Sequence, residues 1–420
     1  MKGGTAVQEQ STAKGSTSSH VWEHLEEFVR EHIQRFIQSL LEEEVTELLG
    51  RTKSVRRAAV DAPPGSRNGH GKPRRLALMS GTITVRRPRV RGLADRFVSR
   101  MLPLFKRRTK QVGALVPQLY LHGLALGDFE LALRGLLGDA APLSATSVQR
   151  LKAQWQLEYE AWQQQRLDDL DVVYVWADGL YVRAGLEDSK AALLVMIGAL
   201  TDGRKVVLAV ESGQRESKES WAAVLRDLRT RGLKPWRCTI ADGHLGIWAA
   251  LGEQQPTAAE QRCWNHRIVN VLDAMPKKHQ AEAKTLLKAM PYAETQGACE
   301  RVRAQFSQRY RTLAPKAVER LAHDWERLVT FYQFPREHWQ HLRTTNVVES
   351  PFAAVRLRTT AGKRYKRVES ATALIWKVLQ VAEQTFRRLN APELLPAVSA
   401  GTQYVDGVQQ NRVGRQEVAA

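Results

Sequence analysis

Apolar residues along the chain recur with two different periods, which predict helices near both ends and a sheet between them. Over Val21–Leu49 they recur at steps of three and four residues, which indicates an amphipathic helix or helical pair closed by Gly50. Residues 113–155 and 276–334 show the same period, and a last amphipathic helix is expected over Val368–Phe386. The exposed face of the first helix mixes charges, so we expect it to pack on a neighbour or a second subunit.

Unbroken apolar runs between these helices predict strands. Val172–Ala177 is apolar or aromatic throughout, which is typical of a strand buried on both faces. The strands and helices expected after it are, in order, Ala191–Leu200, Lys205–Glu211, helix Ser217–Arg231, Trp236–Asp242, helix Leu245–Leu251 and Glu260–Trp264. The order β-β-β-α-β-α-β predicts an α/β domain of the ribonuclease-H-like plan, a mixed sheet with helices on its faces and an all-helical insertion.

Two of the predicted strands end in the same tripeptide, Ala-Asp-Gly. Asp178 is expected at the carboxyl end of the first strand and Asp242 at the end of the later one. That edge of an open α/β sheet is where ligands collect, so the two carboxylates are expected to meet there. Their repulsion would be relieved by a divalent cation, and all-oxygen ligation favours Mg²⁺ or Mn²⁺ over zinc. Taken alone, the Asp178 segment is better interpreted as a simple cap or turn after a strand; the second copy of the pattern is what favours a shared site.

A two-metal site would need a third carboxylate from elsewhere in the chain. Composition does not choose among the downstream candidates, which are Glu253, Glu260, Asp273, Glu294, Glu337, Glu349 and Glu369.

Length and composition restrict the class of protein. The chain has 420 residues, which predicts two to four domains. No apolar run reaches the roughly 18 residues of a membrane span, and the amino terminus lacks the layout of a signal peptide. The three cysteines are widely spaced and offer no disulfide framework. These features predict a cytoplasmic protein without a membrane partner.

Charge is concentrated in one segment. The chain carries a net charge of +19, and residues 51–110 hold 18 Lys and Arg against two acids, which leaves only +3 for the remainder. Such a segment is typical of a module that binds nucleic-acid phosphates, although a solubilising basic arm is the alternative. Arg74–Met79 and Thr82–Arg87 predict a hairpin around Ser80-Gly81. The predicted DNA-binding arginines of this region are Arg67, Arg74, Arg75, Arg86, Arg87, Arg89 and Arg91.

A second DNA-binding element is expected just after the basic segment. Gly127–Leu137 and Ser144–Trp155 resemble the two helices of a helix-turn-helix, with Ser144 as the N-cap of the second. That helix would present Gln149 and Arg150 to DNA. A plain helical hairpin is the alternative.

Several motifs in order resemble the mutator-type insertion-sequence transposases of bacteria. The resemblance runs from about Leu41 to Asp406. It is carried by Arg67-Asn68-Gly69, Pro88-Arg89-Val90-Arg91-Gly92, Asp178-Gly179-Leu180-Tyr181, Glu216-Ser217-Lys218-Glu219-Ser220-Trp221, Asp242-Gly243, Gln261-Arg262-Cys263-Trp264-Asn265-His266 and Leu342-Arg343-Thr344-Thr345-Asn346 before Glu349-Ser350. Each motif is modest alone, and together they are specific.

The resemblance implies a DDE recombinase whose acids fall on Asp178, Asp242 and Glu349. These would hold two Mg²⁺ or Mn²⁺ ions that serve both strand cleavage and 3′-hydroxyl strand transfer. The partners implied are double-stranded DNA, as terminal inverted repeats and as target, and a second or further copy of the chain. The alternatives are a catalytically inactive, transposase-derived DNA-binding regulator and a structure-selective nuclease.

Other residues near these motifs are assigned supporting roles. The Cys-x-x-His pair Cys263 and His266 lacks a second ligand pair for zinc, so a role supporting the metal site is preferred. Arg343, just ahead of the glutamate, is expected to clamp a phosphate. Trp264 and Trp339 are expected in the core rather than stacked on a base. Pro351 suggests that the helix beside Glu349 begins at Ser350 rather than near Thr345.

The expected organisation follows from these elements. It comprises a flexible tail (1–19), a helical and possible dimerisation region (20–50), a basic hairpin region (51–112), a helix-turn-helix-like region (113–168), the first part of the core (169–264), a helical insertion (265–340), the second part of the core with Glu349 (341–390) and a tail (391–420).

Overall fold

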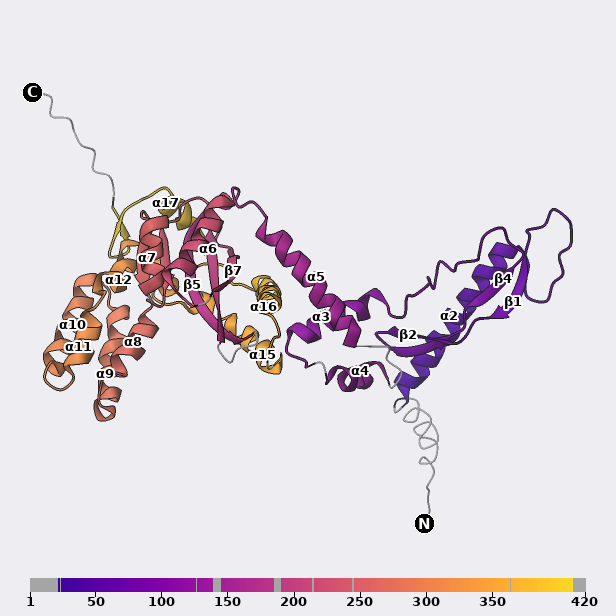
Figure 1. The fold of residues 1–420 in the computed structure, drawn as a ribbon, viewed down its shortest axis with the longest axis horizontal. Coiled ribbons are helices and arrows are strands. Elements are labelled where there is room, and N and C mark those ends of the chain that lie inside the picture. The colour runs from indigo at the N-terminus through magenta and orange to yellow at the C-terminus, as the bar shows by residue number, and fades with distance from the viewer. Residues whose placement is uncertain are drawn as a thin grey trace, which may run out of the picture. The chain divides into compact units, whose positions relative to one another are not determined.

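The computed structural model describes residues 22, 24–125, 127–138, 145–184, 190–213, 215–243, 245–362 and 364–410. The chain divides into two compact units, Met1–Leu151 and Lys152–Ala420, which we call the amino-terminal and carboxy-terminal units (Figure 1). None of the helices in the described ranges is long and apolar enough to cross a membrane.

The amino-terminal unit is built on one long helix, α2 (Leu25–Leu49). It ends, as predicted, where Gly50 adopts the left-handed conformation at φ 59°, which favours glycine. One stripe of the helix, centred on Leu41, packs against the antiparallel hairpin of β2 (Arg74–Leu78) and β3 (Gly81–Val85). The predicted basic hairpin is therefore confirmed, and its apolar face is what holds it to α2.

A second ribbon in this unit has no counterpart in the sequence prediction. β1 (Ser66–His70) pairs antiparallel with β4 (Pro88–Arg91). The glycine-rich run over residues 67–71 correctly indicated that no helix forms there. It carries no alternation of apolar residues, however, so its pairing with a strand some twenty residues away was not visible.

Three helices follow, as expected for residues 113–155. They are α3 (Lys110–Leu121), α4 (Phe129–Leu137) and α5 (Ala145–Gln163). The predicted turn of the helix-turn-helix and its N-cap Ser144 lie outside the described residues, so that motif stays a prediction. α5 is longer than predicted. Its second half belongs to the carboxy-terminal unit, where Trp162 packs on Trp376 with ring centroids 5.7 Å apart.

The carboxy-terminal unit contains the predicted mixed sheet. Its elements are β5 (Val172–Arg183), β6 (Lys190–Leu200), β7 (Lys205–Gly213), α6 (Lys218–Thr230), β8 (Cys238–Ala241), α7 (Leu245–Gln254) and β9 (Ala259–Arg262). The strands lie in the order β7-β6-β5-β8-β9. β5, β6 and β7 run antiparallel, whereas β5, β8 and β9 run parallel. The predicted order of elements and the mixed character of the sheet are confirmed.

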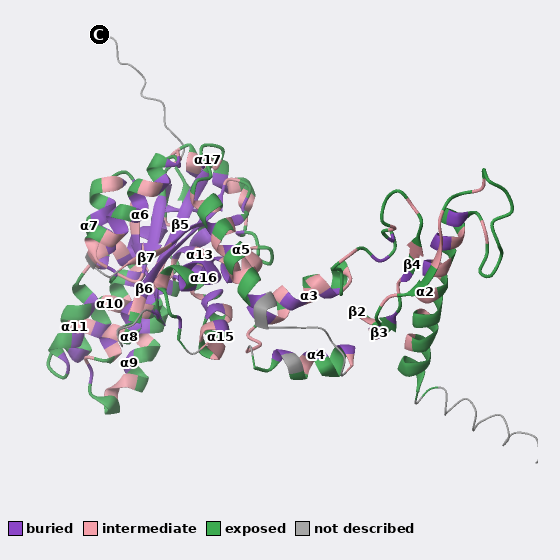
Figure 2. Ribbon diagram, turned by 45° about the vertical axis from the view of Figure 1, so that its right-hand side comes forward, coloured by how far each residue is buried: buried purple, intermediate pink, exposed green. Residues whose placement is uncertain are grey.

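Both faces of the sheet are covered along the first half of β5, which explains why Val172–Ala177 is apolar throughout (Figure 2). Odd-numbered residues such as Val175 and Ala177 join a core with Trp221 of α6 and Trp248 of α7. Even-numbered residues face the opposite side, because successive side chains of a strand alternate. On that side the Trp176 indole donates to the His341 carbonyl at 2.8 Å.

The helical insertion between β9 and the last part of the unit is confirmed. It comprises α8 (Trp264–Leu272), α9 (Lys277–Ala289), η1 (Met290–Tyr292), α10 (Gln296–Tyr310), α11 (Pro315–Ala322), α12 (Trp325–Val329), η2 (Thr330–Gln333), η3 (Arg336–His338) and α13 (Trp339–Leu342). The chain then returns to the sheet through α14 (Asn346–Glu349), α15 (Phe352–Gly362) and α16 (Val368–Glu383).

Residues 391–410, to which the sequence analysis assigned no element, are ordered as η4 (Pro392–Leu394), α17 (Leu395–Ser399), β10 (Tyr404–Val405) and β11 (Val408–Gln409). The last two strands form a hairpin whose turn residues, Asp406 at φ 50° and Gly407 at φ 81°, both have positive φ. Asp-Gly is a sequence typical of such a turn, and this signal was available but was not used.

Candidate active site

Asp178 does not lie at the end of its strand, and that part of the sequence prediction was wrong. β5 continues to Arg183, and Asp178 pairs with Val195 of β6. The strand extends because β6 offers a long antiparallel partner and because Leu180 and Val182 are buried. On its other side β5 loses its partner just before Asp178, since β8 ends at Ala241 opposite Ala177.

The parallel register brings the two aspartates together. Ala177 pairs with Ala241, so Asp178 and Asp242 are the next residues along the two neighbouring strands. Asp178 shares the parity of Tyr174 and Trp176 and therefore lies on the face of the sheet opposite α6 and α7.

The electrostatics of Asp178 show which charges surround it. Burial, followed by repulsion from Asp242, raises the pKa of Asp178 to about 7. Glu349 raises this pKa further, while a hydrogen bond from the Gly179 amide at 2.8 Å and the charge of His266 lower it. The three predicted acids are thus close enough to influence one another, although their catalytic role stays a prediction.

Glu349 is the last residue of the one-turn helix α14, which packs on β5 and β6. The expectation that the helix beside Glu349 begins at Ser350 was wrong. The turn Asn346–Glu349 forms first, and Pro351 then precedes the separate helix α15. Proline suits that position, because the amide hydrogen it lacks is not needed before a first helical turn.

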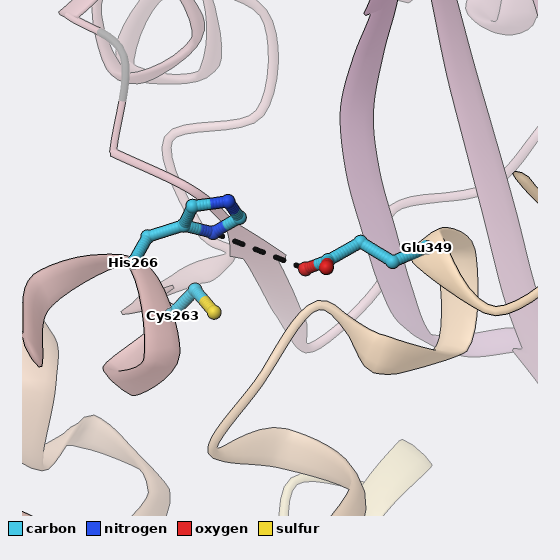
Figure 3. A group of neighbouring side chains, drawn as sticks. All are labelled: Cys263, His266 and Glu349. Atoms are coloured by element: carbon cyan, nitrogen blue, oxygen red, sulfur yellow. Dashed lines mark ion pairs between the residues drawn. The ribbon is translucent and has the colours of Figure 1, made fainter. Parts of the chain in front are cut away.

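Cys263 and His266 lie beside Glu349 (Figure 3). Cys263 is buried at the N-cap of α8, and His266 stands in the first turn of that helix. Their ligand atoms and a Glu349 oxygen all lie within 4.8 Å of one another, and His266 Nδ1 is 3.9 Å from Glu349 Oε1. Hydrogen bonding to Cys263, with the nearby Glu349 and Asp242, raises the pKa of His266 to about 9. The structure therefore places the Cys-x-x-His element at the glutamate.

This set is the group of potential ligands that comes closest together. Within the described ranges, no other three His, Cys, Asp or Glu residues bring their ligand atoms within 4.8 Å of one another.

Sequence reasoning did not single out Arg262, which lies against Gly243, the residue that follows the second aspartate. Gly243 follows Asp242 at φ +99°, and a Cβ there would stand 2.2 Å from Arg262 Nε. The guanidinium is buried and donates to Asp324 at 2.6 Å. Burial lowers the pKa of Arg262, and the nearby Asp324 and Asp242 act in the opposite direction. The signal that could have identified it was a charged residue inside the last predicted strand, Glu260–Trp264; the structure places it at the end of β9.

Arg343 and the two tryptophans lie in the packing of the insertion. The Arg343 guanidinium stands 4.8 Å from the ring centre of Tyr292 and 5.1 Å from that of Phe331. The charged and polar groups that shift its pKa include none of the three acids. Its predicted role as a phosphate clamp stays untested. Trp264 and Trp339 are both buried, as expected for core residues, and each indole donates to a backbone carbonyl.

The predicted DNA-binding residues divide into two groups. Arg67 is tied to α2, because its guanidinium donates to Glu42 at 2.9 Å and to Thr46 at 2.7 Å. Arg74 and Arg87 are half-buried, and Arg74 donates to the Lys106 carbonyl at 2.8 Å. The exposed members are Arg75, Arg86, Arg89, Arg91, Gln149 and Arg150.

A mixed α/β unit with clustered acids, joined to a basic unit, defines the class of protein only broadly, and comparison with known proteins narrows it. The family model for transposases of the Mutator family matches residues 5–388. The chain therefore belongs to the Mutator family of transposases.

Similar proteins of known class support this assignment to a family of transposases. The transposase for insertion sequence element IS6120 of Mycolicibacterium smegmatis is 43% identical over 297 residues, which cover 70% of this chain and 91% of that protein. The transposase for insertion sequence element IST2 of Acidithiobacillus ferrooxidans is 42% identical over 282 residues, covering 67% and 95%.

Among solved structures, the Drosophila P element transposase strand transfer complex covers 70% of this chain and 82% of its own at 14% identity and a TM-score of 0.29. A similarity this low assigns no fold.

Proposed function

We propose that this protein is an active DNA transposase that binds the terminal inverted repeats of an insertion sequence, cleaves one strand at each end and joins the freed 3′-hydroxyl to target DNA. The observation that carries the proposal is the parallel register of β5 and β8, which sets Asp178 beside Asp242 on adjacent strands. Glu349 approaches from α14, which packs on β5 and β6, and it contributes to the raised pKa of Asp178.

The three acids suit divalent cations of the magnesium type. The donor set is all oxygen, and burial together with repulsion from Asp242 raises the pKa of Asp178 to about 7, so a bound cation would relieve both effects. Asp178, Asp242 and Glu349 would hold two Mg²⁺ or Mn²⁺ ions. When bound, these ions supply activation of an attacking oxygen and stabilisation of the leaving oxygen.

The reaction needs no covalent enzyme intermediate. In cleavage, a water oxygen bonds to phosphorus while the bond from phosphorus to the 3′ oxygen breaks, which leaves a 3′-hydroxyl and a 5′-phosphate. In strand transfer, that 3′-hydroxyl attacks a target phosphodiester in the same way, so one set of acids serves both steps. The mixed order β7-β6-β5-β8-β9 supports a ribonuclease-H-like core for this chemistry.

The amino-terminal unit is proposed to hold the end DNA. Its exposed arginines Arg75, Arg86, Arg89 and Arg91 lie in or next to the strands of the two ribbons, within residues 51–110, which hold 18 Lys and Arg against two acids. Joining two ends calls for two or more copies of the chain. Leu25, Phe28 and Phe36 of α2 are exposed and recur on a helical stripe, which suits a contact between copies.

The arginine proposal is tested by binding to end DNA at several salt concentrations. We expect R86A and R89A each to reduce the slope of log affinity against log salt by about 1, because each removes a phosphate contact. R67A is the matched control, since its guanidinium is engaged by Glu42. Unchanged slopes for R86A and R89A would place the DNA elsewhere.

The catalytic proposal is tested with double-stranded oligonucleotides that carry the inverted repeats flanking the gene. Wild type with Mg²⁺ or Mn²⁺ should cleave them and join the ends to a target plasmid, and D178A should lose both activities while retaining end binding. The exposed Glu319 provides the control E319Q. Binding by a wild-type protein that neither cleaves nor joins would favour the regulator, and cleavage without joining would favour a nuclease.

A further inference from the structure

Thr345 is fully buried, with 0% of its surface exposed, at the point where the insertion returns to the sheet. Its hydroxyl oxygen lies 3.2 Å from Cys263 Sγ and 3.5 Å from His266 Nδ1. The same hydroxyl donates to Glu349 Oε1. One side chain therefore contacts all three members of the group drawn in Figure 3.

The backbone of Thr345 reinforces these contacts. Its amide donates to Cys263 Sγ at 3.4 Å, and its carbonyl accepts from the amides of Val348 and Glu349 at 2.9 and 3.0 Å. The residue thus both closes the single turn of α14 and fixes it against the start of α8. Without such ties a four-residue helix has little stability of its own, because the first turn of a helix is the costly one to form.

Two neighbouring bonds join the same pair of elements. The Trp264 amide donates to the Arg343 carbonyl at 2.9 Å, and the Asn265 side chain donates to the Asn346 side chain at 3.2 Å. The backbone on either side of Thr345 is therefore already held at α8. What the Thr345 hydroxyl adds is a direct bond to the Glu349 carboxylate.

The hydroxyl has a single proton, which decides how it is shared. A carboxylate is a stronger acceptor than a thiol or a half-buried imidazole, so the proton goes to Glu349. The lone pairs of the oxygen then accept from the Cys263 thiol or from His266. In this arrangement the orientation of the Glu349 carboxylate depends on the first turn of α8.

We propose that Thr345 is a positioning residue that orients the Glu349 carboxylate for metal binding and connects it to Cys263 and His266. The proposal rests on the proposed function, because it assigns Glu349 a share of the two-cation site. It also gives the Cys-x-x-His element a role that needs no zinc. Cys263 and His266 contact the Thr345 hydroxyl, and that hydroxyl donates to the Glu349 carboxylate.

The test compares T345V, which keeps the branched shape and loses the hydroxyl, with T345S, which keeps the hydroxyl. T372V is the matched control, since Thr372 is also buried but its hydroxyl donates within its own helix, to the Val368 carbonyl at 2.9 Å. The full-length proteins are assayed for joining of pre-cleaved ends to target DNA over a range of Mn²⁺ concentrations. End-DNA binding and the zinc content of each purified protein are measured alongside.

We expect T345V to lose about 10- to 100-fold in joining rate or in affinity for Mn²⁺, which is the usual cost of removing a residue that supports a metal ligand. T345S should remain within about threefold of wild type, T372V should match wild type, and end-DNA binding should not change. If T345V does not fold, T345A removes the same hydroxyl and replaces it in the comparison.

Three results would overturn the proposal. Joining by T345V equal to that of T345S would show that the hydroxyl has no role. Loss in T345S equal to that in T345V would show that keeping the hydroxyl does not preserve function, which contradicts a role carried by its hydrogen bond. Stoichiometric zinc in the wild type that is absent from C263A would make the group of Cys263, His266 and Glu349 a metal centre instead. A wild type that fails to join ends would contradict the proposed function itself.

Discussion

The chain contains two Ala-Asp-Gly segments that the structure uses in different ways. At Asp178 the strand continues for five more residues, because β6 pairs with it throughout. At Asp242 the strand has already ended, and Gly243 turns away at φ +99° with Arg262 packed where a side chain would stand. Identical tripeptides thus reach the same site from an uninterrupted strand and from a turn. What they share is register, since Ala177 pairs with Ala241.

The largest effect is expected when either carboxylate of this pair is neutralised. D178N and D242N should each lower the rates of cleavage and joining by roughly 1,000-fold or more. Both carboxylates are needed by one site, so removing either one removes the function of the pair. The double variant should be little worse than either one. The measurement is the single-turnover rate on end DNA with Mn²⁺, and D273N, at an exposed position, serves as control. Normal activity of either single variant would contradict the proposal that Asp178 and Asp242 act together.

Replacing the glycine of each segment by alanine should lower the free energy of unfolding by different amounts. G243A combines a backbone conformation disfavoured for alanine with a clash against buried Arg262, so we expect the free energy of unfolding to fall by about 2–4 kcal/mol. Gly179 has no positive φ, and a Cβ there would meet the end of the Glu216 side chain, with Cδ at 2.3 Å and Cγ at 2.8 Å, so G179A should cost about 1–3 kcal/mol. Urea denaturation measures both values. A larger loss for G179A would contradict the structural difference.

A smaller effect is expected in the pH dependence of stability without metal. Burial and Asp242 raise the pKa of Asp178 from its ordinary 3.8 to about 7, so between these values the folded chain binds a proton that the unfolded chain has released. The contribution of this group to stability is therefore present at low pH and is lost as pH rises towards 7. In EDTA, D178N should remove this slope, and D242N should weaken it by removing the repulsion. Urea midpoints from pH 4 to 8 would show it, and identical slopes in all three proteins would contradict it.

The sequence predicted the elements in which apolar residues form an unbroken run or recur at a regular spacing. The runs over β5 to β9 indicated five strands and two helices in the right order, and the insertion was visible from its helical spacing. β1 was not predicted, because its residues Ser, Arg, Asn, Gly and His include no apolar side chain that could alternate with polar ones. Asp178 was misplaced at a strand end because the pairing of β5 with the long strand β6, which the residues next to Asp178 do not reveal, carries the strand on to Arg183.

The acids of the candidate site could be proposed from the sequence, whereas the hydrogen bonds and ion pairs around them could not. Resemblance to a family supplied Glu349 from among many carboxylates, and two copies of one tripeptide supplied Asp178 and Asp242. The contact of Thr345 with Cys263 joins residues 82 positions apart, and the sequence next to either residue does not predict it. Arg262 was missed for a similar reason, because its partner Asp324 lies 62 positions downstream.

The small hairpin of β10 and β11 has a consequence for how the molecule is made. Asp406 accepts from the Gln296 amide at 2.7 Å, the Gly407 amide donates to the Tyr332 carbonyl at 3.1 Å, and the Ser399 carbonyl accepts from Arg237 at 2.9 Å. Ribosomes deliver these residues after the sheet and the insertion that they join. A nascent chain that has not yet reached residue 407 lacks the Gly407 bond, so the contacts that fasten this hairpin to the insertion are completed only after both of those elements have been made.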